Sequence, residues 1–296
     1  MNLKISFSLP RHCQVKSPIP VGGISYWAQY FLDCAREITN LVRYGNVGRG
    51  VRNQHLVKKT YEKIWGLGNE AWVRQMTTAT YKSVFANQEL ITNKWFGKNI
   101  YLQIVSQLFD QLDCRSVLEV GSGRGDNITL LSFQNPKLKL TGLELSRMGT
   151  QRSQELITNF PKQLISDFFG EKYLISKESL ENLKQIKFFN GDATQMDFPD
   201  NSFDATFTIM VLEQMPHSYP KALEEICRVT KKYCIFLEPF REANGFKGRL
   251  HLNRVDYFRS SYKEFQKFGL EPIFFYKDYP QKVTFGTGIL VARVVK

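Results

Sequence analysis

The sequence predicts an α/β fold in which helices cover a mostly parallel sheet, and three observations support this prediction. The first is a glycine-rich turn at 121–125, which lies between the apolar run Ser116–Val120 and an apolar helical pattern. The second is the alternation of short apolar runs with amphipathic segments over residues 95–296. The third is an acidic residue at the end of a predicted strand, since open α/β sheets bind ligands at the carboxyl ends of their strands.

The glycine turn is typical of nucleotide cofactor sites, because glycine lets the backbone approach a ligand closely and adopt a positive φ. Its pattern is Glu-x-Gly-x-Gly-x-Gly, from Glu119 to Gly125. A dinucleotide turn requires a small residue where this chain has Asp126, whose charge would oppose a pyrophosphate. We therefore expect that NAD does not bind.

Five further segments follow the turn in a regular order. The first is a strand that ends at Glu144, about twenty residues after the glycines, a separation suited to an acid that binds ribose hydroxyls. One of the segments, Tyr219–Val229, has the pattern of an amphipathic helix with a proline in its first turn, where proline is well tolerated. The segments are Leu140–Glu144, Phe188–Ala193, Asn201–Pro216, Tyr219–Val229 and the buried strand Cys234–Pro239.

In this order and spacing, the segments resemble the motifs of the class I S-adenosylmethionine-dependent methyltransferases of the small-molecule type. The resemblance covers about residues 95–296. It implies a Rossmann-like, seven-stranded, mostly parallel sheet with an antiparallel closing strand, to which residues 1–94 add a helical extension. It also implies S-adenosyl-L-methionine as the cofactor, whose ammonium and sulfonium groups suit an acidic turn.

The resemblance assigns cofactor roles to particular residues. Glu144 is expected to accept hydrogen bonds from the ribose, and Asp192 from the adenine amino group. The family's usual histidine after the fourth strand is Gln214 here, which puts any catalytic role at that position in doubt. The expected cofactor residues are Glu119, Gly121, Ser122, Gly123, Gly125, Glu144, Leu145, Asp192, Ala193 and Met210.

No catalytic residue is strongly indicated, because a sulfonium is already a good methyl donor and orientation alone lowers the barrier substantially. Candidates for a general base lie on the loops after the fourth and fifth strands, at the carboxyl end of the sheet. The first group is Glu213, Gln214 and His217, and the second is Glu238, His251 and Tyr257.

Residues 1–94 have a different character from the predicted core. Residues 1–20 contain three prolines and are expected to form an arm. Apolar residues at three- and four-residue steps then predict helices, separated by glycine-rich breaks at 45–50 and 66–68. The predicted helices are Ser25–Val42, Gln54–Trp65 and Ala71–Phe85, and Ile100–Leu112 leads into the glycine strand.

Every tryptophan falls within the first hundred residues, at 27, 65, 72 and 95. We expect this segment to form a lid over the acceptor side of the pocket, with aromatic walls rather than cofactor contacts. At the other end of the chain, Ser261–Gly269 is expected to be helical with a glycine stop. Glu271–Tyr276 and Gly288–Val295 are expected to be the two closing strands.

Composition narrows the functional classes. No apolar run is long enough to span a bilayer. Five scattered cysteines without a Cys-x-x-Cys pair predict reduced thiols and a cytoplasmic protein. The four histidines form no ligand pattern, so no metal site is expected.

The net charge of the chain is +12, and residues 1–100 hold 14 Lys and Arg against 5 Asp and Glu. A basic surface attracts nucleic acid, anionic lipid or acidic substrates. We expect a small-molecule acceptor methylated on oxygen, nitrogen or carbon. The alternatives are an RNA or protein methyltransferase and a non-catalytic S-adenosylmethionine-binding module, and the sequence leaves the oligomeric state open.

Overall fold

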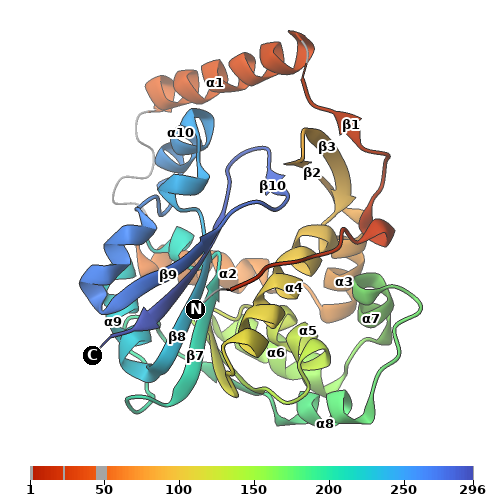
Figure 1. The fold of residues 1–296 in the computed structure, drawn as a ribbon, viewed down its shortest axis with the longest axis vertical. Coiled ribbons are helices and arrows are strands. Elements are labelled where there is room, and N and C mark those ends of the chain that lie inside the picture. The colour runs from red at the N-terminus through yellow and green to blue at the C-terminus, as the bar shows by residue number, and fades with distance from the viewer. Residues whose placement is uncertain (1–2, 23, 45–51, 296) are drawn as a thin grey trace.

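The computed structural model describes residues 3–22, 24–44 and 52–295. A seven-stranded sheet forms its centre, in the order β6-β5-β4-β7-β8-β11-β9 (Figure 1). All neighbours are parallel except β11, which is antiparallel to both β8 and β9. The strands are β4 (Ser116–Val120), β5 (Lys139–Glu144), β6 (Lys187–Asn190), β7 (Phe203–Ile209), β8 (Thr230–Glu238), β9 (Leu270–Tyr276) and β11 (Gly288–Val294). The predicted fold class, with its antiparallel closing strand, is confirmed.

Both faces of this sheet are covered, because side chains of a strand alternate between its two faces. On β8, Ile235 and Leu237 pack with the helices α4 and α5, whereas Cys234 and Phe236 pack with α9 and η4. The helix before β4 and the helices after β4 and β5 cover the face of the sheet on which Ile235 and Leu237 lie. These helices are α4 (Trp95–Gln111), α5 (Asp126–Gln134), α6 (Arg147–Thr158), α7 (Lys162–Phe169) and α8 (Lys177–Gln185).

The second face is covered by α9 (Tyr219–Val229) and the 3-10 helix η4 (Tyr262–Phe268). Ser261 caps η4 together with Glu264, and Gly269 ends it with φ +72°. The predicted helix at this position is therefore present, but as the tighter 3-10 form. The remaining helices of the core are the short η2 (Leu212–Gln214), η3 (Arg241–Ala243) and α10 (Phe246–Arg254).

The N-terminal extension contains the helices α1 (Ile24–Tyr44), α2 (Gln54–Ile64) and α3 (Asn69–Thr78). It also contains strands, which the sequence analysis did not predict. The predicted helix Ala71–Phe85 is wrong in its second half: the helix α3 ends at Thr78, and the chain continues as β2 (Thr80–Phe85) and β3 (Gln88–Asn93). These pair with β1 (Ile19–Pro20) and with β10 (Gln281–Lys282) in a second sheet. The predicted glycine break at 45–50 lies outside the described residues.

The N-terminal arm, which also forms the short helix η1 (Arg11–Cys13), is fixed to the core along α4. The side-chain amides of Gln103, Gln107 and Gln111 each pair with both the N–H and the C=O of an arm residue. Four helical residues rise about 6 Å, close to the roughly 6.6 Å of two extended residues, so every second arm residue meets a new glutamine. Their partners are Ser8, Ser6 and Lys4 in turn.

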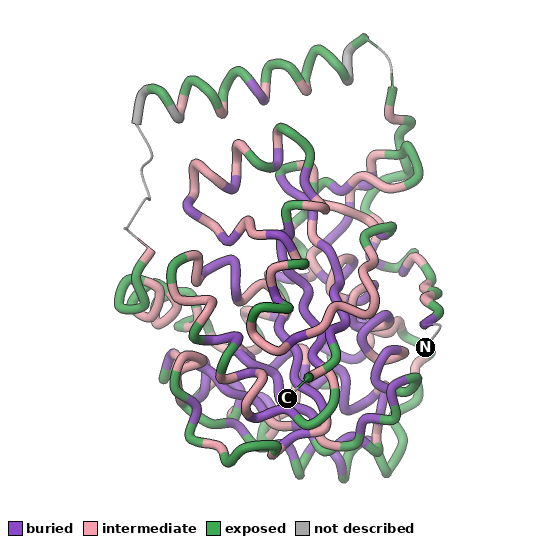
Figure 2. Tube along the Cα trace, turned by 60° about the vertical axis from the view of Figure 1, so that its left-hand side comes forward, coloured by how far each residue is buried: buried purple, intermediate pink, exposed green. Residues whose placement is uncertain are grey.

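Burial follows this arrangement (Figure 2). The central sheet and α4 hold the core, while α1 lies apart from it and touches the body at α10. None of the described helices is both long enough and apolar enough to cross a membrane.

Candidate functional site

A pocket opens at the carboxyl ends of β4, β5 and β7, where the glycine turn leaves β4. The glycines at 121, 123 and 125 all have positive φ, between +56° and +78°. A Cβ on Gly121 would lie 2.5 Å from Cγ2 of Val211, so this position cannot hold a larger residue without moving the loop after β7. The sequence pattern therefore reflects a backbone requirement as well as access to a ligand.

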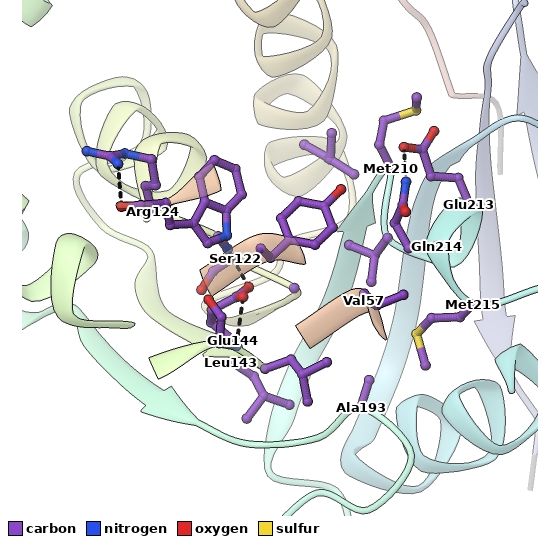
Figure 3. A pocket seen from close by; sticks show the side chains of 18 of the residues that line it. Val57, Ser122, Arg124, Leu143, Glu144, Ala193, Met210, Glu213, Gln214 and Met215 are labelled. Atoms are coloured by element: carbon purple, nitrogen blue, oxygen red, sulfur yellow. Dashed lines mark hydrogen bonds between the residues drawn. The ribbon is translucent and has the colours of Figure 1, made fainter. Parts of the chain in front are cut away.

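Glu144, at the end of β5, holds the glycine turn in place through a hydrogen bond to its backbone. Its Oε2 accepts a hydrogen bond from the N–H of Gly123 at 2.8 Å, and its Oε1 accepts one from the N–H of Ser146 at 3.0 Å. Burial raises the pKa of this carboxyl, and the two amide donors oppose that rise. Glu144 lines the pocket beside Ser122, whose buried hydroxyl has no hydrogen-bond partner (Figure 3).

Asp192 lines the same end of the pocket, in the loop after β6. Its Oδ1 accepts hydrogen bonds from the N–H and the hydroxyl of Thr194 at 2.8 and 2.9 Å. Its Oδ2 accepts from the side-chain amide of Gln54, which belongs to α2. An amino group therefore already lies where the adenine amino group is expected.

A polar corner closes the pocket near the start of α5. The ammonium of Lys98 donates to the amide oxygen of Asn127 at 2.6 Å and lies 3.7 Å from Oδ2 of Asp126. The amide of Asn127 donates to Glu119 at 2.6 Å, and the indole N–H of Trp72 donates to Asp126 at 2.8 Å. Burial raises the pKa of Glu119 to about 8. The corner presents the ammonium of Lys98 and the carboxylate of Asp126 to the pocket.

The opposite end is formed by η2, which follows β7 (Figure 3). Glu213 accepts a hydrogen bond on Oε1 from the side-chain amide of Gln214 at 2.7 Å, whereas its buried Oε2 has no partner. Burial raises the pKa of Glu213 to about 7. The guanidinium of Arg52 donates to the amide oxygen of Gln214 and lies over the ring of Tyr257, 4.2 Å from its centroid. The hydrogen bonds from Arg52 to Gln214 and from Gln214 to Glu213 therefore hold the side chain of Glu213, which lines the pocket, in one position.

Glu238 supports η2 rather than the pocket. Its carboxylate accepts from the hydroxyl of Thr208 at 2.7 Å and from the N–H groups of Val211 and Glu213 at 3.0 and 3.2 Å. Burial raises the pKa of Glu238 to about 8. We conclude that Glu238 acts on the site by holding η2 in place.

The helix α2 covers the pocket and is tied to the core at several points. The carboxylate of Glu62 accepts from the N–H groups of Arg147 and Met148, at 2.8 and 2.9 Å, and so caps α6. The ring of Trp65 lies against Gly123, 3.1 Å from a Cβ built there. Through Gln54, α2 also contacts Asp192, a residue with a predicted cofactor role.

Most predicted cofactor residues line the pocket, namely Gly121, Ser122, Gly123, Glu144, Leu145, Asp192, Ala193 and Met210. Glu119 and Gly125 lie behind this lining: Glu119 holds Asn127, and Gly125 caps α5 with φ +78°. Met210 has φ +58°, a conformation that is uncommon for a residue with a side chain and is frequent at functional sites.

Three of the predicted catalytic candidates lie away from the pocket lining. His217 binds Asp256 at 2.9 Å, His251 binds Glu37 at 3.2 Å, and Tyr257 lies under Arg52. Of the candidates, Glu213 and Gln214 are brought to the pocket.

The sequence analysis missed several lining residues, because they come from the extension and from α4. Their aromatic and basic character was visible in the sequence, but the contact with the glycine turn was not. They are Gln54, Val57, Lys58, Tyr61, Lys98 and Tyr101, whereas the lining residues Trp65 and Trp72 belong to the tryptophans expected as aromatic walls.

Comparisons with known proteins bear on the domain and its fold. Residues 118–237 match the family model described as a methyltransferase domain. The [4+2]-cyclase SpnF has the same fold, with a TM-score of 0.52 at 17% identity over 81% of this chain and 95% of that chain. No curated protein matches the sequence.

Two further solved structures are similar at lower scores. An S-adenosylmethionine-dependent methyltransferase from Aquifex aeolicus has a TM-score of 0.42 at 15% identity, covering 64% of this chain and 88% of that chain. One from Methanosarcina mazei has a TM-score of 0.45 at 16% identity, covering 61% and 92%.

Proposed function

We propose that the chain, whose residues 118–237 match a methyltransferase domain, is a class I S-adenosylmethionine-dependent methyltransferase that methylates a small molecule with Glu213 as the general base. The observation that carries this proposal is the unpartnered, buried Oε2 of Glu213 at the end of a pocket that α2 covers. When bound, S-adenosylmethionine supplies an electrophilic methyl group on a positively charged sulfur.

The residues that line the pocket fit this cofactor. Glu144 is proposed to accept from the ribose hydroxyls, and Asp192 from the adenine amino group in place of Gln54. The methionine end carries an ammonium and a carboxylate, which match the carboxylate of Asp126 and the ammonium of Lys98 in the polar corner. The unpartnered hydroxyl of Ser122 offers a further hydrogen bond to a ligand at the glycine turn.

Glu213 is suited to take a proton from the acceptor. Its pKa of about 7 leaves a useful fraction of carboxylate near neutral pH. Gln214 donates to Oε1 and leaves Oε2 without a hydrogen-bond partner, so Oε2 is the oxygen proposed to take the proton, and Gln214 and Arg52 are positioning residues. A positioned base contributes about 10²–10⁴-fold to a rate. Orientation of the acceptor, together with the exclusion of water by α2, supplies the rest.

A small acceptor is favoured over a polymer by the cover that α2 places on the pocket. Gln54, Glu62 and Trp65 attach this helix at points along its length, so an acceptor enters beneath it. The net charge of +12 is the observation that favours an RNA or protein acceptor.

The experiment incubates the full chain with S-adenosylmethionine labelled on the methyl group and a cell extract separated into small-molecule, RNA and protein pools. We expect label in the small-molecule pool. Label only in RNA or only in protein would replace the small-molecule proposal, and no label in any pool, together with normal S-adenosylhomocysteine binding, would favour a non-catalytic binding module.

The role of Glu213 is tested separately by Glu213→Gln. We expect a loss of labelling by about 10²–10⁴-fold with unchanged S-adenosylhomocysteine affinity, because the amide cannot take the proton. The matched control is Glu224→Gln, an exposed glutamate on α9 that should keep full activity. Activity of Glu213→Gln equal to that of the control would remove Glu213 from the mechanism.

A further inference from the structure

The helix α1 is turned the opposite way from an ordinary surface helix. Its acidic residues face the body, where Asp33 pairs with Lys247 at 2.5 Å and Glu37 pairs with Arg254 and His251 at 2.5 and 3.2 Å. Surface helices normally place such a charged face in water and their apolar face on the core. Here ion pairs attach α1 to α10, together with the buried Cys34 and the contact of Lys247 with the ring of Tyr30.

The apolar face of α1 points away from the protein. Exposed fractions reach 91% at Ile24, 67% at Phe31, 63% at Leu32 and 79% at Val42. Trp27 and Ile38 are also exposed and lie on the same side of the helix. Figure 2 shows exposed backbone along most of its length. Single exposed apolar residues are normal, but a contiguous row along one helix marks an interaction surface.

The shape of this face fits a flat apolar surface. At 3.6 residues per turn, the arc from Trp27 through Ile24 to Leu32 covers roughly 140° of the helix circumference. That arc is wider than the narrow two-position seam of a helix paired with one other helix. The helix of 21 residues lies along the outside of the molecule (Figure 1), so its whole length is presented sideways.

The charge of the same region fits an anionic surface. Both described acids of α1 are paired with cations of α10, whereas Arg36 is exposed. Helices α1 and α10 together carry five Lys and Arg against two Asp and Glu, within a chain of net charge +12. Amphipathic helices with aromatic and aliphatic residues on one face and a basic surround bind at the headgroup boundary of anionic membranes.

We propose that α1 is an interfacial helix that docks the protein on an anionic lipid surface, with Ile24, Phe31, Leu32 and Val42 immersed at the headgroup boundary. The ion pairs of Asp33 and Glu37 hold α1 on the body with this face outward. The protein then lies on the bilayer without crossing it.

The test measures co-sedimentation of the full chain with phosphatidylcholine vesicles, with and without phosphatidylglycerol. We expect binding to the anionic vesicles, weakened by added salt because screening removes the attraction to the lipid charge. The double variant Phe31→Glu with Leu32→Glu should lower the partition coefficient by about tenfold or more, since it removes apolar burial and adds repelled charge. The control is Leu174→Glu, which is 89% exposed but lies between α7 and α8, and it should bind like the wild type.

Thermal unfolding and S-adenosylhomocysteine binding show whether the double variant is folded, and both should be unchanged because α1 does not line the pocket. These readouts also separate this proposal from the proposed methyl transfer. No binding of the wild type to anionic vesicles, or equal binding of the double variant, would overturn it. A lipid-free dimer of the wild type that the double variant converts to a monomer would assign the face to a second copy instead.

Discussion

Replacement of Glu144 should damage both the fold and the cofactor site. Its carboxylate is only 7% exposed and accepts from two backbone N–H groups, those of Gly123 and Ser146. Glu144→Ala leaves both buried donors without a partner, at a cost of about 1–3 kcal/mol each. We therefore expect a loss of roughly 2–6 kcal/mol in the free energy of unfolding, a large share of the stability of an ordinary domain.

The same substitution should weaken cofactor binding. If Glu144 accepts from both ribose hydroxyls, two hydrogen bonds to a charged group are lost, each worth about 1.5–3 kcal/mol. At 1.4 kcal/mol for each tenfold change, the dissociation constant of S-adenosylhomocysteine should rise by about 10²–10⁴-fold. Glu144→Gln keeps one acceptor oxygen and should fall between the wild type and Glu144→Ala in both measurements.

Calorimetry with S-adenosylhomocysteine and thermal unfolding of the same samples give the two quantities. The control is Glu181→Ala, an exposed glutamate on α8, which should change neither. A destabilised Glu144→Ala that binds with wild-type affinity would mean that Glu144 only fastens the turn. Unchanged stability would refute the reasoning from the two amide donors.

Three further predictions follow from the packing around the site and the arm. Glu213→Gln should match the wild type in stability near pH 4 and exceed it by about 3 kcal/mol near pH 8. The reason is that the pKa of Glu213 is raised, so its contribution to the free energy of unfolding is complete below about pH 4.5 and is lost as the pH rises through about 7. Urea unfolding at the two pH values measures this difference, and a difference that does not change with pH would contradict the prediction. Gly121→Ala should abolish S-adenosylhomocysteine binding and lower the melting temperature, because φ is +72° and the new Cβ would lie 2.5 Å from Val211; normal binding in calorimetry would show that the turn adjusts. Gln107→Ala should release the arm at Ser6, because it removes two neutral hydrogen bonds to the backbone of Ser6, at a cost of about 1–3 kcal/mol, and a longer one to its hydroxyl. Trypsin should then cleave at Lys4 faster than in the wild type, whereas an equal rate would mean that the apolar contacts alone hold the arm.

The sequence was sufficient for the elements whose signals are local. The strand Ser116–Val120 and the helix Tyr219–Val229 have the bounds that their patterns predicted. In both, the apolar period and the flanking turn or cap residues lie within the element itself. The positive φ values of the glycine turn could also be predicted locally, because glycine is the residue that adopts them readily.

The strands β2 and β3 were missed because their stability comes from partners rather than from their own pattern. They form a two-residue hairpin in which Ala86 and Asn87 both have positive φ, a turn that a glycine would have signalled more clearly. The outer partner of β2 is β10, which lies between β9 and β11 near the other end of the chain. Such a pairing cannot be inferred from the segment Thr80–Phe85 alone.

The two halves of the pocket differ in the same way. The proposed cofactor half is built from the turn after β4 and the end of β5, so local motifs predict its residues. The proposed acceptor half depends on a contact between distant segments, since Arg52 reaches Gln214 across 162 positions. The acceptor wall is therefore set by how α2 folds back over the sheet. It follows that substitutions at Arg52 or Val57 should alter the preference for the acceptor while the glycine turn is retained.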